Sequence, residues 1–229
     1  VIHKGVSEAE TLRAAELAFS RGWQTIKLYF MIGLPTERPE DVAGIAHLAQ
    51  AVLAVGRRYH GKRARVTVGV STMVPKPHTP FQWAAQATRD EIMEKVVILQ
   101  QGMRDRGLRL SWHDAESSHV EAILSRGDRR VGRAILEAWR RGARFDAWSE
   151  HLSWPAWEAG MRLAGLDLAF FTSRQRDIRE VLPWDHVDVG VPRWHLVAQW
   201  RRALGLDSEP RQREKFVLLH NEDLAAVRA

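Results

Sequence analysis

The string most suggestive of chemistry is Lys27-Leu-Tyr-Phe-Met-Ile-Gly-Leu-Pro-Thr-Glu37, an apolar run that ends in a glycine, a proline and an acid. Gly33 has no Cβ, so a flat ligand ring can approach the backbone at this point. Pro35 fixes the turn that leaves the run, and Glu37 lies just before a predicted helix start. The pattern favours a ligand contact at the end of a strand, although an ordinary strand-turn-helix junction produces the same pattern.

A second string, from Ser71 to Trp83, contains Pro75, Pro77 and Pro80. A stiff, extended loop of this kind presents backbone amides and carbonyls to a ligand with little loss of conformational entropy. The same prolines can also shape a plain connection.

Two polar groupings have the side chains used in acid-base catalysis or in metal binding. The first is His113 with Asp114. The second consists of Asp146, Glu150, His151, Asp185, His186 and Asp188. We take Asp146, Glu150, Asp185 and His186 as candidate catalytic residues. The alternative is that these groups, with the nearby tryptophans, form satisfied structural hydrogen bonds.

The two segments that carry the larger grouping, 145–151 and 182–190, are predicted to meet in space. Burying a carboxylate or imidazole without a hydrogen-bond partner lowers stability by roughly several kcal/mol, so a shared polar network is the favoured arrangement. We expect Asp146 or Glu150 within hydrogen-bond reach of His186 or Trp184.

Seven arginines and two acids lie between Arg126 and Arg144. We predict that the arginines share one helical face opposite Val131, Ile135, Ala138 and Trp139; they are Arg126, Arg129, Arg130, Arg133, Arg140, Arg141 and Arg144. Such a stripe suits an RNA backbone or another phosphate-rich partner, because each guanidinium can donate two hydrogen bonds to a phosphate. A solvated face of an amphipathic helix has the same composition.

The composition excludes several kinds of chemical site. The chain has 229 residues, a net charge of +6 and no cysteine, which excludes disulfides, thiolate metal sites and cysteine nucleophiles within it. No stretch is long and apolar enough for a membrane helix, and no signal peptide is visible, so a cytoplasmic protein without a membrane partner is expected. The chain begins at Val1, and we expect it to be a piece of a longer protein.

The elements that must position these residues follow from hydrophobic periodicity. We predict helices from about residue 8 to 21, from Pro39 toward Gly56, and from Thr88 to Gly107, with strands at 25–34 and 66–74. Strands that alternate with helices indicate neighbouring parallel strands, whose carboxyl ends carry the active site.

From Leu110 onward the strand pattern fades and short helices dominate. Eight of the ten tryptophans lie from Trp112 onward, which suggests a boundary near residue 110. We therefore divide the chain into an α/β part (1–110), a mainly helical extension (111–205) and a charged linker or tail (206–229).

The two proline-terminated strings together resemble the late barrel strands of radical S-adenosylmethionine (SAM) enzymes. In that superfamily, one strand ends in Gly-(Leu/Phe)-Pro-x-Glu, and the next leads into a Pro-x-(Pro/Gly)-x-Thr-Pro loop. The chain is most similar to the cobalamin-binding type of unassigned function, in which a Trp-rich extension follows. The strings that carry this similarity are Ser111-Trp-His-Asp114, Ala143-Arg-Phe-Asp-Ala-Trp-Ser-Glu-His151 and Leu182-Pro-Trp-Asp-His-Val-Asp-Val-Gly190.

The resemblance implies the last two strand-helix units of a partial radical SAM (β/α) barrel, followed by the helical extension. It assigns the adenine of SAM to Met31, Ile32 and Gly33, with further contacts from Val74 and Pro75. SAM and a 4Fe-4S cluster are implied for the parent protein, and cobalamin use is left open. The chain departs from the pattern at Arg38, where Thr or Ser is common, and it lacks the Cys-x-x-x-Cys-x-x-Cys cluster motif.

Three functions therefore remain open. The first option is that the chain is a fragment of a radical SAM enzyme, inactive alone, that contributes part of the adenine wall and a substrate lid. Alternatively, it is a non-catalytic basic module that docks RNA or another phosphate-rich partner. The third option is an unrelated α/β barrel enzyme.

Overall fold

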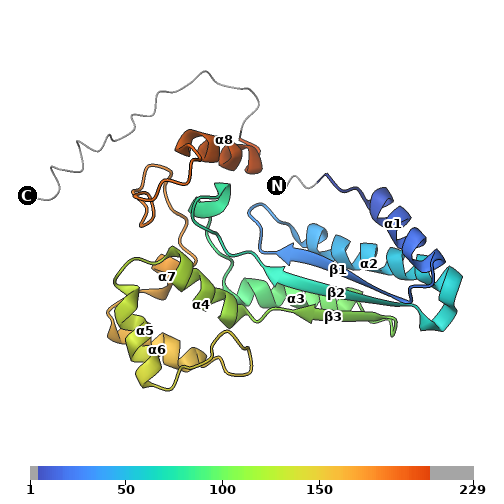
Figure 1. Ribbon diagram of the computed structural model, residues 1–229, viewed down its shortest axis with the longest axis horizontal. Coiled ribbons are helices and arrows are strands. Elements are labelled where there is room, and N and C mark those ends of the chain that lie inside the picture. Colours follow the sequence, from blue (N-terminus) through green and yellow to red (C-terminus); the bar gives the residue numbers. More distant parts are fainter. Residues whose placement is uncertain (1–4, 207–229) are drawn as a thin grey trace, which may run out of the picture.

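The computed structural model describes residues 5–206 (Figure 1). The chain forms a parallel three-stranded sheet that three helices cover on one side, followed by a helical extension beyond the carboxyl ends of the strands. The predicted tail at 206–229 lies outside the described residues except for Leu206.

The sheet part alternates helices and strands. Its elements are α1 (Glu8–Ser20), β1 (Thr25–Ile32), α2 (Pro39–His60), the 3-10 turn η1 (Gly61–Arg63), β2 (Arg65–Thr72), the 3-10 turn η2 (Pro80–Trp83), α3 (Arg89–Gly102) and β3 (Leu108–Trp112). Reciprocal capping boxes begin α1 at Ser7 with Glu10 and α3 at Thr88 with Glu91, as predicted. Pro39 occupies the first turn of α2, where its missing N–H has no helical partner to lose.

The predicted pairing of the first two strands is confirmed. The strand order is β1-β2-β3, and β1 runs parallel to β2 with Thr25 opposite Arg65 and Ile32 opposite Thr72. The fold is therefore mixed α/β with a small parallel sheet.

The third strand was not predicted. β3 pairs in parallel with β2, with Val66 opposite Leu108 and Val70 opposite Trp112, and it crosses the predicted boundary at residue 110. Its five residues include Arg109 and Ser111, which face away from the core, so the apolar pattern is too short to indicate a strand. The extension begins only with α4.

The extension is helical, as predicted. It contains α4 (Ala115–Arg126), α5 (Val131–Arg140), α6 (Trp154–Leu163), α7 (Leu168–Phe171) and α8 (Arg193–Ala203). One apolar cluster lies between α4, α5, α6 and α7, and includes Ile123 and Met161. Another joins η2 to α8 through Trp83, Trp184 and Trp200. Three of the ten tryptophans therefore pack the extension against the loop that leaves β2.

The sheet has one covered face and one open face. Val66, Val68 and Val70 of β2 are buried under the helices, against α2 residues such as Val42 and Val52. On β1 the exposed positions alternate with partly buried ones, and Thr25, Lys27, Tyr29 and Met31 lie on the open face. Within residues 5–206, no helix combines the length and apolar character needed to cross a membrane.

Two glycines of α2 provide a matched test of the packing under the sheet. A Cβ added at Gly56 would lie 2.6 Å from the Phe19 ring of α1, whereas a Cβ at Gly44 would meet nothing within 4 Å. We expect Gly56→Ala to lower the free energy of unfolding by about 2 kcal/mol through overpacking. Gly44→Ala should raise it by about 1 kcal/mol, because alanine has the higher helix propensity. Urea denaturation of the two variants measures both effects, and a stabilising Gly56→Ala would contradict the close contact between α1 and α2.

Candidate functional site

The open face of the sheet carries three rows of side chains across the strands. The first row to cross all three strands consists of Lys27, Thr67 and Arg109, and the pair of Thr25 and Arg65 precedes it at the amino ends. The next row contains Tyr29, Gly69 and Ser111. The row at the carboxyl ends contains Met31 and Ser71, and the same register extends it to His113, whose N–H donates to the carbonyl of Val70 at 3.0 Å.

Tyr29 lies across Gly69 in the middle row. A Cβ on Gly69 would lie 3.1 Å from Cδ1 of Tyr29, so a larger residue there would displace the ring. Tyr29 is 79% exposed and Met31 is 40% exposed. An aromatic ring and a thioether therefore lie open on the sheet beside the hydroxyl groups of Ser71 and Ser111, a surface suited to a flat organic ring with polar substituents.

Of the predicted adenine contacts on β1, only Met31 faces this open surface. Ile32 is 1% exposed and packs in the core on the helix side, so its side chain cannot contact a ligand on the open face. The reason is strand alternation: neighbouring residues point to opposite faces of the sheet.

Gly33 lies in the turn after β1, and its Cβ side faces protein. Its φ is +79°, and a Cβ there would lie 3.2 Å from Cβ of Ala87, so the space beside it is filled by protein. The glycine is needed for the left-handed backbone and for close packing against Ala87. Val74 is half-buried and Pro75 is buried in the loop that follows β2.

A buried ion pair holds the turn after β1. The Gly33 N–H donates to Oε1 of Glu37 at 3.0 Å, and Nζ of Lys95 on α3 lies 2.8 Å from the same oxygen. The side chains of Glu37 and Lys95 are 7% and 18% exposed. Lys95 was not among the predicted site residues. Its signal is its place beside Ile92 and Val96 on the apolar stripe of α3, where an unpaired ammonium is costly.

The loop after β2 is fixed by contacts with the extension. Oε1 of Gln82 accepts hydrogen bonds from the His78 N–H at 3.1 Å and from Nε1 of Trp184 at 2.7 Å. The proline-rich loop is therefore a structural connection between the sheet and the extension as well as a rim of the open face.

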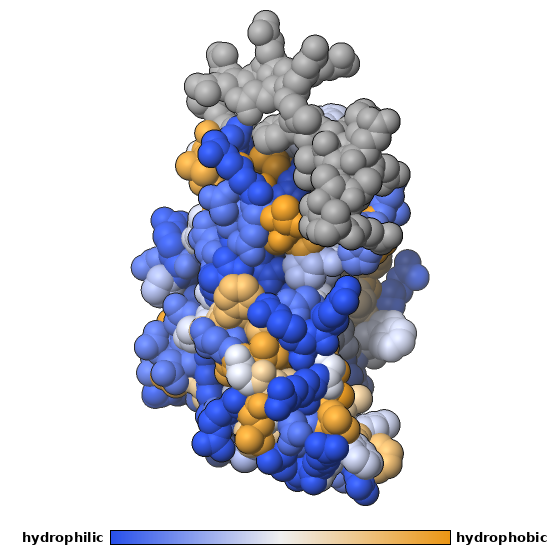
Figure 2. Space-filling view, turned by 90° about the vertical axis from the view of Figure 1, so that its left-hand side faces the viewer, coloured by the Kyte–Doolittle hydropathy of each residue, from blue (hydrophilic) through white to orange (hydrophobic). Residues whose placement is uncertain are grey.

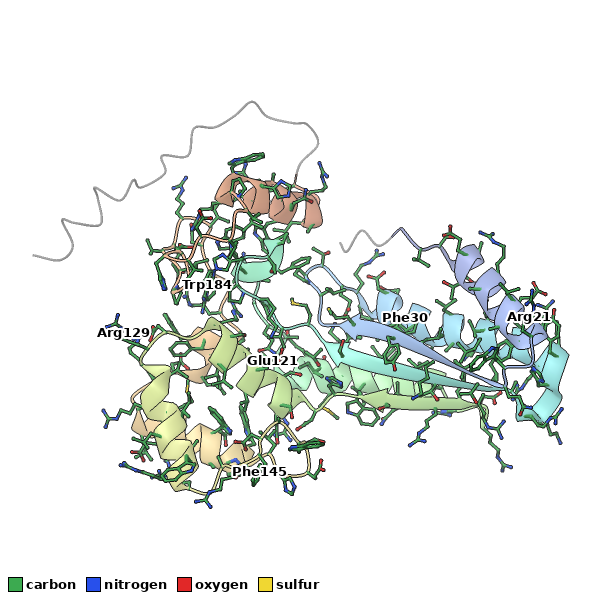
Figure 3. All side chains as sticks on the ribbon, in the orientation of Figure 1. Arg21, Phe30, Glu121, Arg129, Phe145 and Trp184 are labelled. Carbon is green, nitrogen blue, oxygen red and sulfur yellow. The ribbon has the colours of Figure 1, made fainter. Side chains whose placement is uncertain are left out.

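The predicted network between 145–151 and 182–190 does not form. Trp184 donates to Gln82, and Asp185 accepts hydrogen bonds from the Leu182 N–H and from Arg193, both at 2.8 Å. Asp146 accepts from the Ser153 N–H at 3.4 Å. Figure 3 shows Phe145 and Trp184 on opposite sides of the extension.

The candidate catalytic residues are therefore not brought together. Asp146 and Asp185 complete local turns, while Glu150 and His186 are exposed. Asp114 of the smaller grouping caps α4 by accepting from the Glu116 N–H at 3.4 Å. Within residues 5–206, no three His, Asp or Glu side chains lie close enough together to hold a metal ion.

The predicted arginine stripe is also not one face. The segment is split by the turn between α4 and α5, and Arg126 is fully buried. Arg130 pairs with Asp128, while Arg140 and Arg141 both pair with Glu137. Val131 and Ala138 are buried as predicted, but Ile135 and Trp139 are exposed by 42% and 53%.

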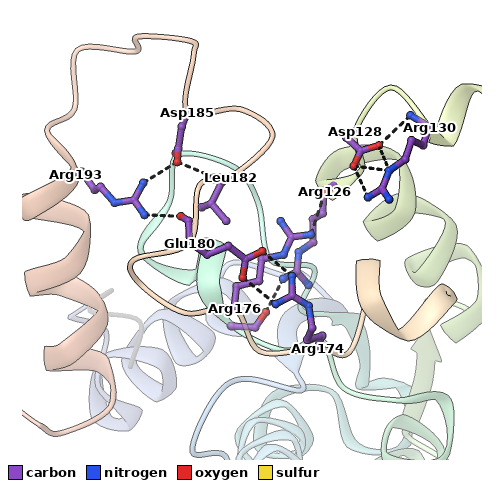
Figure 4. Close-up of polar contacts among 10 residues, drawn as sticks. Arg126, Asp128, Arg130, Arg174, Arg176, Glu180, Leu182, Asp185 and Arg193 are labelled. Carbon is purple, nitrogen blue, oxygen red and sulfur yellow. Dashed lines mark hydrogen bonds and ion pairs between the residues drawn. The ribbon is translucent and has the colours of Figure 1, made fainter. Parts of the chain in front are cut away.

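Arg126 instead joins three segments of the chain (Figure 4). Its guanidinium donates to the carbonyls of Thr172 at 2.6 Å and Ala84 at 2.8 Å, and its own carbonyl accepts from Arg176 at 3.0 Å. Burial, with the neighbouring charges of Arg176 and Arg174, lowers the pKa of Arg126 to about 9. Sequence reasoning could not separate this arginine from its exposed neighbours.

Arg126, Arg174 and Arg176 meet at one junction. Among the carboxylates drawn in Figure 4, Glu180 is the one that lies at this junction. Arg174 donates to both oxygens of Glu180, at 2.8 and 2.7 Å, and these bonds lower the pKa of Glu180. Arg176 lies over the Trp184 ring at 5.0 Å. The junction is thus stabilised by backbone carbonyls, an aromatic face and one ion pair.

Comparison with known proteins gives one relative at low identity. No protein-family model matches the chain, and no solved structure matches it significantly. The chain is 30% identical over 134 residues to an uncharacterized protein of Methanocaldococcus jannaschii. The match covers 58% of the chain and 28% of the relative, so the chain spans little more than a quarter of that protein.

The pair of Glu37 and Lys95 gives the first prediction for this region. Glu37→Gln leaves the Lys95 ammonium largely buried without its carboxylate, and we expect a loss of about 3 kcal/mol in unfolding free energy. The double variant Glu37→Gln/Lys95→Met should lose less than the sum of the single changes, because neither charge is left alone. Glu121→Gln, which breaks the exposed pair with Lys76, is the control and should cost less than about 1 kcal/mol. Additive single changes would show that the buried pair is not coupled.

Arg126 and Arg129 form a second matched pair, since both belong to the predicted stripe. Arg126→Met removes the donors to the carbonyls of Ala84 and Thr172, and we expect a loss of about 2 kcal/mol. Arg129→Met changes an exposed side chain and should alter stability by less than about 0.5 kcal/mol. Equal thermal stability of the two variants would rule out the junction as a source of stability.

Proposed function

We propose that this chain forms one wall of the SAM site in a radical SAM enzyme, of which it supplies the late strands of the barrel and a helical extension. The observation that carries the proposal is the one-sided sheet. Parallel sheets are normally covered on both faces, whereas here Tyr29 and Met31 lie open on the face opposite the helices. In a barrel, that face lines the interior and its carboxyl end lines the active site.

The edge of the sheet supports the same arrangement. β1 is a terminal strand of the three-stranded sheet. Beside it lies an apolar groove of about 560 Å³ between α1 and β1, lined by residues that include Val6, Ala14, Ala18, Ile26 and Leu28. An earlier strand-helix unit of the parent enzyme would pair with β1 and fill this groove, as neighbouring units of a parallel barrel do.

The residues that suit the adenine ring are Tyr29 and Met31, with Ser71 as a polar neighbour. Tyr29 offers an open aromatic face, and Met31 a polarizable thioether that adapts to a planar ring. Met31 is also among the residues that the resemblance assigns to the adenine, whereas Tyr29 is a new assignment. Ile32 packs in the core and Gly33 forms the turn, so neither residue is assigned to the adenine.

The chain itself supplies no ligand for the 4Fe-4S cluster, because it contains no cysteine. The cluster provides the electron for reductive cleavage of SAM in enzymes of this kind, and its thiolates must come from another part of the parent protein. Cobalamin enters only through the resemblance, and no residue of the chain is assigned to it. The extension, fixed to the β2 loop through Gln82 and Trp184, frames the carboxyl end of the sheet rather than supplying acid-base groups.

SAM binding tests this proposal. In the parent enzyme, with its cysteine motif and reconstituted cluster, Tyr29→Ala and Met31→Ala should each weaken SAM binding about tenfold, roughly 1.4 kcal/mol. Thr67→Ala, on the same face but one row nearer the amino ends of the strands, is the control and should leave SAM affinity unchanged. The isolated chain should bind SAM more weakly than about 1 μM in calorimetry. Unchanged SAM affinity in both site variants, or a parent reading frame without closely spaced cysteines, would overturn the assignment.

A further inference from the structure

A pocket separate from the groove beside β1 lies where the extension meets α3. It has a volume of about 280 Å³ and is lined by the start of α3, by α4, by α6 and by the segment that includes α7. The charged and aromatic side chains around it are Arg89, Asp90, Glu116, His119, Trp154 and Glu158. None of these residues belongs to the open face of the sheet, so an inference from this pocket does not rest on the SAM site.

His119 is the buried imidazole of the pocket, and one of its two nitrogens has no partner. The side chain is 6% exposed, and Nδ1 lies 2.7 Å from the Ala115 carbonyl, one turn earlier on α4. A carbonyl only accepts, so Nδ1 carries the proton, and Nε2 of the neutral ring is left with a lone pair. Among residues 5–206 no group donates a hydrogen bond to Nε2. Because buried polar atoms are normally paired, the ring lacks a donor on the side turned away from its own helix.

The carboxylates around the pocket outnumber the cations. Glu116 pairs with Arg89 at 3.2 Å. Asp90 lies in the first turn of α3, where it offsets the partial positive charge of that helix end. Glu158 is exposed and has no ion-pair partner in the part of the chain that the structure describes. The pocket therefore favours a positively charged occupant.

Two helices present their side chains to the pocket in pairs. Glu116 and His119 are three residues apart on α4, and Trp154 and Glu158 are four residues apart on α6, so each pair shares one helical face. The rings of His119 and Trp154 have centroids 6.0 Å apart and planes at 68°. An aromatic ring attracts a nearby cation through its quadrupole. The lone pair, the free carboxylate and the indole ring thus converge on one space.

A metal ion is less suited to this space than an organic cation. Within residues 5–206, no three His, Asp or Glu side chains are placed to hold a metal, and protein-bound metals are normally held by at least three such ligands. An ammonium group makes smaller demands, because its separate N–H bonds can reach a lone pair, a carboxylate and water.

The surface of the extension also favours a small ligand over a protein partner. Figure 2, which views the side of the molecule that carries α5, shows hydrophobic residues separated by hydrophilic ones rather than one continuous apolar patch. Protein interfaces are built around a more apolar centre than this.

We propose that the pocket binds a small primary amine, whose ammonium group donates to Nε2 of His119 and pairs with Glu158 beside the Trp154 ring. The volume lies at the lower end of the range for ligand pockets, so the amine has few heavy atoms. Its binding would link α3 of the sheet part to α4 and α6 of the extension.

NMR titration of the full chain with butan-1-amine tests the charge requirement. We expect saturable binding with a dissociation constant of about 1 mM, and Glu158→Gln should raise it at least threefold, roughly, by removing the ion pair. Glu94→Gln removes the same charge from an exposed position on α3 outside the pocket and should leave the affinity unchanged. Equal weakening by the two variants would overturn the proposal, because the amine would then respond only to the overall charge.

His119→Asn tests the hydrogen bond to Nε2. The Asn amide can keep the donor to the Ala115 carbonyl but places no atom at Nε2, so affinity for butan-1-amine should fall by about tenfold. Butyltrimethylammonium has the same charge and chain but no N–H, and it should bind the unmodified chain at least about tenfold more weakly. This comparison decides the point even if His119→Asn does not fold.

Three results would contradict the amine site. They are equal affinities for butan-1-amine and butyltrimethylammonium, no binding at about 20 mM amine, and Zn²⁺ binding tighter than about 10 μM that His119→Asn abolishes. The last would identify the pocket as a metal site.

Discussion

A buried guanidinium that has no carboxylate partner among residues 5–206 fixes the extension to the rest of the molecule. Arg126 is fully buried, and its donors are directed to the carbonyls of Ala84 and Thr172. Leaving a cation in such a place is costly, which is why burial and the adjacent arginines depress its pKa. The cost is offset only if the loop after β2, the end of α4 and the segment after α7 all hold their places. The same requirement positions Trp184 on Gln82, and with it the apolar cluster that carries α8.

A second buried contact holds the turn after β1. Glu37 satisfies the Gly33 N–H and the Lys95 ammonium at once. The turn after β1 is thereby tied to α3, which packs on the covered face. Polar contacts therefore hold both the turn after β1 and the loop after β2, and the side chains on the open face take no part in these contacts. Tyr29 and Met31 can remain exposed there because the fold does not need them for its own core.

The extension uses its acidic side chains to stabilise turns and a helix start. Its acids and imidazoles do not assemble into a catalytic group: Asp185 stiffens the turn at Leu182 together with Arg193, Asp146 closes the turn at Ser153, and Asp114 caps α4. Phe145, on the loop between α5 and α6, lies on the side of the extension opposite Trp184 (Figure 3).

Local structure could be predicted from the sequence: the capping boxes at Ser7 and Thr88, the helices they begin, and two parallel neighbouring strands joined by a helix. These features depend on contacts within a few residues or on a strong apolar period, which a sequence displays directly. β3 was missed because five residues with Arg109 and Ser111 on an open face show too little pattern. Strand alternation would have placed Ile32 opposite Met31, and a lysine on the apolar stripe of α3 would have pointed to a buried partner. Three features follow from the three-dimensional fold alone: Arg126 is buried while Arg129 is exposed, Lys95 reaches Glu37, and residues 145–151 lie apart from 182–190. Those outcomes depend on which distant segments meet, and the energies that bring them together arise from burial and pairing that no local pattern records.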